Sequence, residues 1–342
     1  MTKINNVFET RKNAPSLDTL AQLGTNTQNE VLEVAPTTTI NDSKRLLKRA
    51  RRKYFSNHFV IKLAEASKRN PWSTLEKSYW NSYHCNKSLA AFMDGSLLGK
   101  YCKNRWCMVC NSIRTAQSIN SYVPMISTWG NAAFCTATRP NVKWWELDDE
   151  IKELHSIFGQ IKDTIKKRNQ RGKTPFKLVG VRKFECTYNA IKDTYHPHFH
   201  IVFQSKNMAI DFMSEWMKRN PTANRKGQDI RSVDENSLCE LFKYMTKVIS
   251  KTGKGKRVIY ADAMDKIFNS MKGKRVMQNF GFKMPKIEEK EVNMISRGMV
   301  LDVFEWQQDC ADWVGVHSDE NLSGYTPSKE FKKFVKTKMI VR

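Results

Sequence analysis

Residues 196–200 read His-Pro-His-Phe-His and overlap a stretch from Pro197 to Phe203 whose aromatic and β-branched residues predict a β-strand. Alternate side chains of a strand share one face, so His196, His198 and His200 are expected to project together. Three of the seven histidines of the chain fall in this window, and neutral imidazole is the commonest protein metal ligand. The stretch therefore predicts a metal site on one face of a sheet, although surface or partly buried histidines are the plainer alternative.

The segment before this strand predicts its hairpin partner. Residues 176–187 read as a second strand, joined to the first through the polar stretch 189–194. A turn centred between residues 191 and 192 would place Glu185 directly across from His198. A carboxylate beside imidazoles, with open positions, suits Mg²⁺ or Mn²⁺ held against a phosphate, although the same ligands would accept Zn²⁺ or Fe²⁺.

The rest of this region alternates strand and helix patterns. The predicted elements are a buried strand at 132–138, a helix over 151–165 after an acidic start at 148–150, a helix near 208–219, a strand near 229–233 and a helix from about 237 to 250. We expect a single α+β domain with a central antiparallel sheet and helices on one side.

The last of these helices supplies a candidate nucleophile. Glu240 and Tyr244 stand one turn apart on one helix face. A tyrosine that attacks phosphorus leaves a covalent phosphotyrosine, and a glutamate could later position water to hydrolyse it. The alternative is an aromatic side chain on a packed helix face. Basic residues around the tyrosine favour a phosphate partner, and the ones we expect to bind DNA are Lys243, Lys247 and Lys251.

A cluster of cysteines precedes the predicted sheet. Cys85, Cys102, Cys107 and Cys110 offer four thiolates, the last two at Cys-x-x-Cys spacing, which predicts a structural Zn²⁺ site. His84 could replace Cys85 as a ligand, and a set of unconnected reduced cysteines is the alternative to a metal site. A redox motif is less attractive because four ligands leave no open position. Among the basic residues of this cluster, we expect Arg105 to contact DNA.

The charge of the chain predicts a polyanionic partner. Lys and Arg outnumber Asp and Glu by 58 to 34, for a formal charge of +24. No stretch approaches the roughly 20 apolar residues that span a bilayer, and the N-terminal residues lack the basic, apolar and small-residue pattern of a signal peptide. We expect a cytoplasmic protein that binds nucleic acid. Seven of the positive charges fall between Lys44 and Lys53, in a helix-compatible run that could lie along phosphates or form a solvated basic face.

Composition and pattern divide the chain into five parts. They are a disordered polar tail at 1–42, a basic helical segment at 43–79, the Cys cluster at 80–118, the α+β domain with the clustered histidines at 119–285 and a C-terminal region of unknown role at 286–342.

Several separate stretches resemble the rolling-circle plasmid replication initiators of the HUH endonuclease superfamily, which is named for a His-hydrophobic-His motif. The stretch Phe134–Thr138 (FCTAT) resembles the family's first motif, residues 196–200 its metal motif, and Glu240–Tyr244 (ELFKY) its nucleophile motif. The segments 271–275, 280–283 and 102–110 also resemble this family, so the resemblance covers residues 80 to 285. Cys135 and Ala137 depart from the usual residues of the first motif.

The resemblance implies a mechanism and its partners. In the family the outer members of the His-hydrophobic-His triplet bind the divalent metal and an acidic residue helps, which implies His198, His200 and Glu185 here. The glutamate one turn before Tyr244 implies the single-tyrosine plasmid branch. Such an initiator binds the double-strand origin, exposes a single strand, nicks it through a 5′-phosphotyrosine and leaves a 3′-OH primer. A host polymerase extends the primer, and a host helicase is implied as well.

Two other functions stay open at the level of sequence. A relaxase or transposase would use the same nuclease core, but the glutamate before Tyr244 and the Cys cluster argue against it. A non-catalytic zinc-containing regulator that binds nucleic acid would explain the charge and the cysteines but not the clustered histidines.

Overall fold

The computed structural model describes residues 42–242, 248–252, 255–284 and 299–341. Its helices are α2 (Ser43–Arg69), α3 (Glu76–Tyr83), α4 (Met108–Ile126), α5 (Leu147–Gln170), α6 (Lys206–Arg219), η2 (Arg225–Gly227), α7 (Glu235–Phe242), α8 (Ala261–Ser270) and α9 (Lys329–Thr337). Its strands are β1 (Ser88–Phe92), β2 (Leu97–Gly99), β3 (Ala133–Thr138), β4 (Gly180–Asn189), β5 (Thr194–Phe203), β6 (Asp229–Ser232), β7 (Ser250–Lys251), β8 (Arg257–Tyr260), β9 (Met277–Phe280), β10 (Val300–Gln307), β11 (Asp312–Gly315) and β12 (Met339–Ile340).

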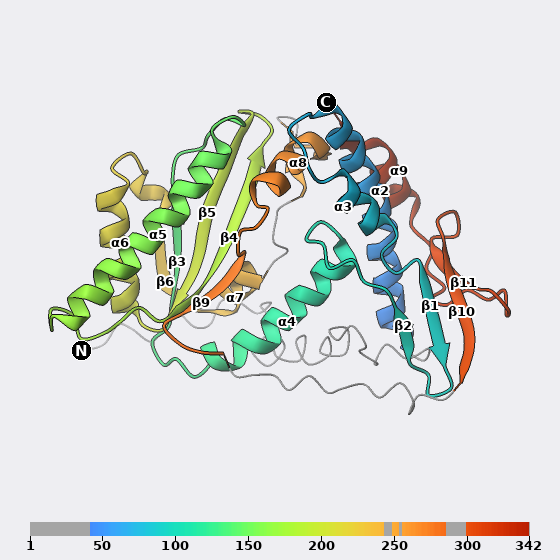
Figure 1. Ribbon diagram of the computed structural model, residues 1–342, viewed down its shortest axis with the longest axis horizontal. Coiled ribbons are helices and arrows are strands. Elements are labelled where there is room, and N and C mark those ends of the chain that lie inside the picture. The colour runs from blue at the N-terminus through green and yellow to red at the C-terminus, as the bar shows by residue number, and fades with distance from the viewer. Residues whose placement is uncertain (1–41, 243–247, 253–254, 285–298, 342) are drawn as a thin grey trace, which may run out of the picture.

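A five-stranded sheet forms the centre of the fold, so the predicted α+β class is confirmed. Its strand order is β6-β3-β5-β4-β9, and the neighbouring strands are antiparallel. The hairpin of β4 and β5 brings residues 180–189 against 194–203, which confirms the predicted connection. On one face of the sheet, Phe199 packs against Phe158 of α5 and Trp216 of α6, and Figure 1 shows both helices lying along the sheet.

Helices also cover part of the other face, so the prediction of helices on one side only is wrong. Phe134, Val181 and Val202 lie side by side on this second face, because the register pairs them across β3, β5 and β4. They form a buried cluster with Val123 of α4 and Leu241 of α7. The apolar residues at this end of the strands occur on both faces, and each face needs a cover. The other end of this second face carries the histidines.

The Cys cluster and the C-terminal region share a second sheet, with the strand order β11-β10-β1-β2. Strand β1, just after Cys85, pairs with β10 through contacts such as Leu89 opposite Phe304. Farther along, β12 pairs in parallel with β8, and β8 pairs with β7. Residues at both ends of the described chain therefore pack together, although the sequence pattern placed them in separate parts.

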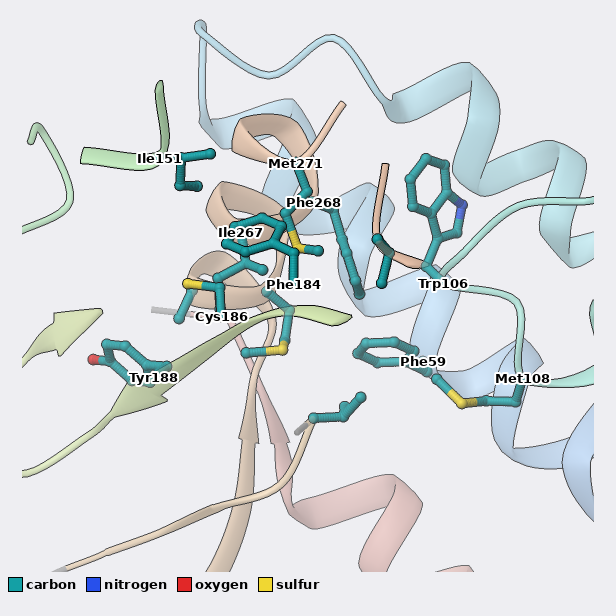
Figure 2. Close-up of a cluster of buried hydrophobic side chains, with 14 of the residues drawn as sticks. Phe59, Trp106, Met108, Ile151, Phe184, Cys186, Tyr188, Ile267, Phe268 and Met271 are labelled. Atoms are coloured by element: carbon teal, nitrogen blue, oxygen red, sulfur yellow. The ribbon is translucent and has the colours of Figure 1, made fainter. Parts of the chain in front are cut away.

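The long helix α2 joins these parts. Figure 2 shows Phe59 of α2 in one buried cluster with Trp106, with Phe268 of α8 and with Phe184 of β4. The ring centroids of Phe59 and Phe268 are 6.3 Å apart, and those of Trp106 and Phe268 are 5.5 Å apart. Helix α2 is thus a core element, and only part of its surface is left for the basic side chains that the sequence analysis singled out.

Two predicted elements end differently in the structure. The helix predicted from 237 to 250 is described as α7 up to Phe242, whereas Ser250 begins strand β7, opposite Val258. The predicted end of this helix is therefore wrong, because cross-strand hydrogen bonds take up the backbone at Ser250. The tail predicted as disordered lies outside the described residues, apart from its last position. Among the described residues, no helix is long and apolar enough to cross a membrane.

Candidate functional site

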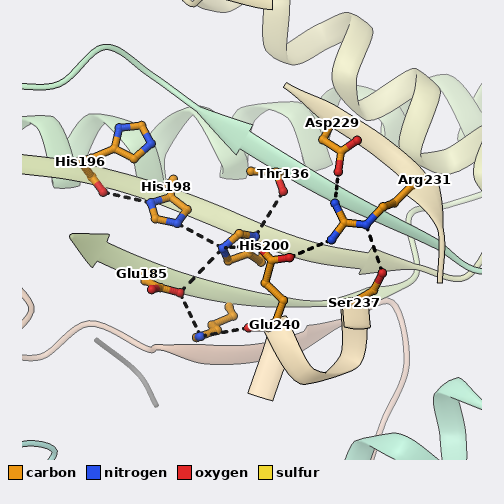
Figure 3. Close-up of polar contacts among 10 residues, drawn as sticks. Thr136, Glu185, His196, His198, His200, Asp229, Arg231, Ser237 and Glu240 are labelled. Carbon is orange, nitrogen blue, oxygen red and sulfur yellow. Dashed lines mark hydrogen bonds and ion pairs between the residues drawn. The ribbon is translucent and has the colours of Figure 1, made fainter. Parts of the chain in front are cut away.

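The β4–β5 hairpin brings two histidines and a glutamate together. Glu185 lies directly opposite His198, which is the register that the hairpin predicted, and Thr136 of β3 lies opposite His200. The ligand atoms of Glu185, His198 and His200 all lie within 4.8 Å of one another. Figure 3 shows the three side chains converging on the same face of the sheet.

The geometry of these three residues fits a divalent cation. The Nε2 atoms of His198 and His200 are 3.2 Å apart, and His200 Nε2 lies 3.7 Å from Glu185 Oε2. Ligands that bind one metal at about 2.0–2.2 Å stand roughly 3–3.5 Å from each other, so small adjustments would suffice. We infer that Glu185, His198 and His200 form a cation site with positions left for a further ligand.

Neighbouring groups orient the two imidazoles. His198 Nδ1 donates to the carbonyl of His196 at 3.0 Å, which leaves the Nε2 lone pair directed at the site. His200 Nδ1 lies 3.3 Å from the hydroxyl of Thr136. Burial lowers the pKa of His198, and the nearby carboxylate of Glu185 only opposes this shift. Metal ligands are commonly held by such a second hydrogen bond, and the lowered pKa favours the neutral form that binds a cation.

His196 occupies a different position from the other two histidines. Its ring stacks on His198 with centroids 4.8 Å apart, and burial lowers its pKa to about 4. Its ring is not among the three groups whose ligand atoms converge. The structure therefore gives His196 a supporting place through its carbonyl and its stacked ring.

Glu240 reaches the same site from α7. Its Oε1 lies 3.7 Å from His200 Nε2, and its Oε2 pairs with Arg231 at 2.8 Å. Arg231 also pairs with Asp229 and lies over the ring of Phe134, with its Cζ 4.3 Å from the ring centroid. These contacts fix the Glu240 side chain at the edge of the candidate cation site (Figure 3).

The other residues predicted near α7 are less fully described. Tyr244, Lys243 and Lys247 lie outside the described residues, just after the last described residue of α7. Lys251 lies in β7. The roles predicted for these four residues in cleavage and in DNA binding remain predictions.

Sequence reasoning missed Lys183, which the structure places beneath the site. Its side chain is 1% exposed, and its Nζ lies 3.0 Å from Glu185 Oε2. The same ammonium donates to the backbone carbonyl of Glu240 at 3.3 Å. Lys183 thus ties a candidate ligand to α7. The sequence signal that could have identified Lys183 was its position two residues before Glu185, on the same face of the strand.

The three candidate ligands lie in a cavity of about 980 Å³. Its lining includes Thr136, His196 and Glu240 from the sheet side, and it also includes Lys48, Arg51 and Arg52 from α2. A part of the basic run that the sequence analysis considered for phosphates therefore faces the candidate cation site, although more than 130 residues separate them along the chain.

The four predicted cysteines also converge. Their Sγ atoms form a second group within 4.8 Å, with 3.5 Å between Cys85 Sγ and Cys110 Sγ and 3.7 Å between Cys102 Sγ and Cys110 Sγ. A tetrahedral zinc with Zn–S bonds of about 2.3 Å separates its sulfur atoms by roughly 3.8 Å. Hydrogen bonds with the other three thiols, Cys107 first, hold the pKa of Cys102 far below its ordinary value. The cluster can therefore hold zinc.

The local backbone explains how these thiols meet. Asn86 and Lys103, each directly after a cysteine, have φ values of 51° and 58°. This left-handed conformation turns the chain sharply and lets the amide of Cys102 donate to Cys85 Sγ at 3.4 Å. Cys85 therefore belongs to the described cluster, and His84 is not needed as its substitute.

Helix α2 contacts the Cys cluster on another of its faces. The Nζ atom of Lys53, which is 1% exposed, donates to the carbonyl of Tyr83 at 2.6 Å. Burial lowers the pKa of Lys53 to about 8, although the four cysteines oppose this shift. Ser56 accepts a hydrogen bond from the amide of Met108, directly after Cys107, at 3.2 Å. The basic run is thus split between the Cys cluster and the cavity.

Arg105 is engaged inside the protein. Its guanidinium donates to the carbonyl of Met271 at 2.9 Å and to the carbonyl of Lys274. These bonds tie the Cys cluster to the end of α8. The DNA contact that the sequence predicts for Arg105 stays a prediction.

The chain is similar to known replication proteins. A family model described as a replication protein matches residues 97–299, which include the candidate cation site and α7. A protein rep of Staphylococcus aureus is 31% identical over 189 residues, covering 48% of this chain and 79% of the relative. A protein rep of Streptococcus pneumoniae serotype 2 (strain D39 / NCTC 7466) is 28% identical over 194 residues, covering 48% of this chain and 58% of the relative. No solved structure matches significantly.

Proposed function

The chain belongs to the replication protein family whose model it matches, and from this premise we propose that it initiates rolling-circle replication of a plasmid by nicking one DNA strand. The nick would be site-specific and would lie at the double-strand origin. This function requires an endonuclease site, a nucleophile and a place for a single strand.

One observation carries the proposal. Two imidazoles and a carboxylate, on adjacent strands and with Nε2 and Oε2 atoms 3.2–3.7 Å apart, face a cavity of about 980 Å³ that basic residues also line. A cation bound there, which we propose to be Mg²⁺ or Mn²⁺, would act as a Lewis acid on a phosphate oxygen. A structural metal site would be closed, whereas these ligands leave positions for a substrate.

Tyr244, Glu240 and Lys183 would have separate roles in the cleavage of the DNA strand. The phenol oxygen of Tyr244 forms a bond to phosphorus, the bond from phosphorus to the 3′ oxygen breaks, and that oxygen takes up a proton as the phenol loses one. The products are a 5′-phosphotyrosine and a free 3′-OH. Glu240, held by Arg231 at the edge of the site, would later orient water toward the phosphotyrosine. Lys183 would hold Glu185 and α7 in position relative to each other through its two bonds.

The replication role implies partners that the chain would need. The 3′-OH would prime a host polymerase, and a host helicase would separate the strands ahead of it. The cysteine cluster would hold Zn²⁺ as a structural ion, because four thiols complete a tetrahedral site.

The test is a nicking assay with the full chain, Mn²⁺ and a supercoiled plasmid that carries the DNA flanking its gene. We expect conversion to the open circular form, a covalent protein–DNA adduct that maps to Tyr244 by mass spectrometry, and no adduct with Tyr244→Phe. Nicking by Tyr244→Phe at the parent rate would overturn the nucleophile. Binding without any nicking would favour a non-catalytic regulator.

A further inference from the structure

A basic face of α2 lies across the cavity from the candidate cation site. Lys48, Arg51, Arg52 and Phe55 stand at positions i, i+3, i+4 and i+7, so they share one side of the helix. All four line the cavity that also contains His198. Residues four apart on a helix rise by about 6 Å, which gives a row of cations along one wall.

Two cations of this row, Lys48 and Arg51, are available to a ligand. Lys48 and Arg51 are exposed, and among the residues that the structure describes neither forms an ion pair with a carboxylate. By contrast, Arg49 and Lys53 on another face of α2 are 5% and 1% exposed and serve the fold around the Cys cluster. Helix α2 therefore buries Arg49 and Lys53 within the fold, whereas Lys48 and Arg51 are exposed and line the cavity.

Two aromatic rings lie beside this row. Phe55 of α2 and Phe331 of α9 both line the cavity, and their planes are 13° apart with centroids 6.3 Å from each other. The guanidinium carbon of Arg51 lies 5.3 Å from the centroid of Phe331. Aromatic faces next to cations are the features on which unpaired bases stack while phosphates are neutralised. In a duplex the faces of the bases are already stacked on each other, so such rings favour a single strand.

We propose that the α2 face made by Lys48, Arg51 and Arg52, with Phe55 and Phe331, binds the single DNA strand whose phosphate enters the site at Glu185, His198 and His200. The inference rests on the proposed function, because the α2 face forms the wall of the cavity opposite the candidate cation site. It also goes beyond the family match, since Lys48, Arg51 and Phe331 lie outside residues 97–299. The negatively charged DNA strand would lie between the basic side chains of α2 and the metal cation bound at the sheet.

The test measures binding of a fluorescent single-stranded DNA oligonucleotide by anisotropy, in buffer to which no Mg²⁺ or Mn²⁺ is added, so that cleavage does not occur and zinc is not stripped from the Cys cluster. The variant Lys48→Gln/Arg51→Gln removes two charges and keeps a flexible polar side chain at each position. The matched control is Lys166→Gln/Lys167→Gln, two exposed residues on α5 beyond the other face of the sheet. Thermal unfolding of both variants checks that the fold is retained.

We expect the α2 variant to bind roughly 10- to 100-fold more weakly than the parent and the control to bind like the parent. The slope of log affinity against log salt should fall in magnitude by about 1.4 for two lost contacts with a single strand. Parent-like affinity and slope in the α2 variant, or an equal loss in the control, would overturn the inference.

The outcome is separable from that of the nicking assay. If the parent shows no Tyr244-dependent nicking but the α2 variant still loses single-strand affinity, the proposed function fails and the strand-binding face stands. If the parent nicks while the α2 variant binds the oligonucleotide like the parent, only the strand-binding face fails.

Discussion

The two candidate metal centres of this protein differ in how many ligands they bring and in what surrounds them. The Cys cluster has four thiols, of which Cys85, Cys107 and Cys110 are buried, and it leaves no position for a substrate. The other centre has two imidazoles and one carboxylate facing a cavity, with Glu240 at its edge. A closed ligand set stabilises a fold, whereas an open set can bind and polarise a substrate. Helix α2 contacts the Cys cluster and lines the cavity of the other centre, so one helix borders both candidate sites.

The largest effect should follow from opening the closed site. Cys107→Ser removes one of four ligands, and because zinc binding at such a site contributes to folding, the free energy of unfolding should fall by more than about 4 kcal/mol. Elemental analysis of the purified protein should show zinc lost, and thermal unfolding should show the destabilisation.

The control for this variant is Cys310→Ser, which alters an exposed cysteine outside the cluster. It should keep both the zinc and the melting temperature. If Cys107→Ser retained one zinc per chain and the parent stability, the Cys cluster would not be a structural metal site, and the contrast between the two centres would break down.

Removing a ligand from the open site should lower activity strongly and change stability only slightly. His200→Ala removes a candidate ligand, so Mn²⁺-dependent nicking should fall by at least about 100-fold, since a Lewis-acid cation supplies several kcal/mol to a phosphoryl transition state. The stability should change by less than about 2 kcal/mol, because the ring borders a cavity. Nicking rates under single-turnover conditions and thermal unfolding measure the two effects.

His196→Ala is the neighbouring control, because its ring lies outside the three converging ligands. Its nicking rate should stay within about 10-fold of the parent, as expected for a residue that supports a ligand from behind. Equal losses for the two variants would mean that all three histidines act at the cation, and the ligand set would need to be revised.

Local patterns were enough to predict the sheet side of the site. The alternation around His198 and the polar turn before it gave both the face and the register, and the structure pairs Glu185 with His198 as that register requires. The convergence of the four cysteines followed from their spacing and from the preference of thiolates for one metal. These features depend on contacts between residues that are near each other along the chain.

The other side of the site depends on contacts that no local pattern encodes. Helix α2 meets the cavity only because its apolar face packs with α8 and β4, residues that lie more than 100 positions away. The pairing of β1 with β10 brings the C-terminal region to the Cys cluster in the same manner. Strand alternation places Lys183 on the face of Glu185, but its bond to the Glu240 carbonyl depends on the packing of α7 over the sheet and was not predictable from the strand alone.

A smaller effect should follow from substitution of Lys183, which contacts the candidate ligand Glu185 of the open site. Its ammonium shares Glu185 Oε2 with any bound cation, so Lys183→Met should strengthen apparent Mn²⁺ binding several-fold. The same change removes the bond to the Glu240 carbonyl, and nicking at saturating Mn²⁺ should fall roughly 10-fold because α7 is less well positioned.

Mn²⁺ titration of the nicking rate separates these two effects. Lys183→Arg restores the charge and should recover part of the rate. A fall in rate with weaker Mn²⁺ binding would contradict the positioning role, because it would mean that Lys183 supports the cation site as a whole.

The smallest effect concerns the face of the sheet opposite the open site, where His155 belongs to neither of the metal-binding groups found among the described residues. The ring of His155 on α5 lies against Phe184 and Phe199, with its Nδ1 3.0 Å from Arg182. Burial, with help from Arg182 and Lys274, lowers the pKa of His155 from 6.5 to about 4. As the pH falls from 6.5 to 4, the unfolded chain takes up this proton before the folded chain does, so stability is lost over that window.

His155→Gln should therefore reduce the dependence of unfolding free energy on pH between 6.5 and 4. Its share stays below the limit of about 1.4 kcal/mol per pH unit that one proton allows, because the ring is partly exposed to solvent. His58, His196 and His198 also have lowered pKa values and contribute slopes of their own, so urea unfolding of parent and variant must be compared at each pH. Identical slopes would mean that His155 titrates alike in both states. A flatter slope in the variant would show that burial on the covered face keeps His155 neutral in the folded protein as the pH falls.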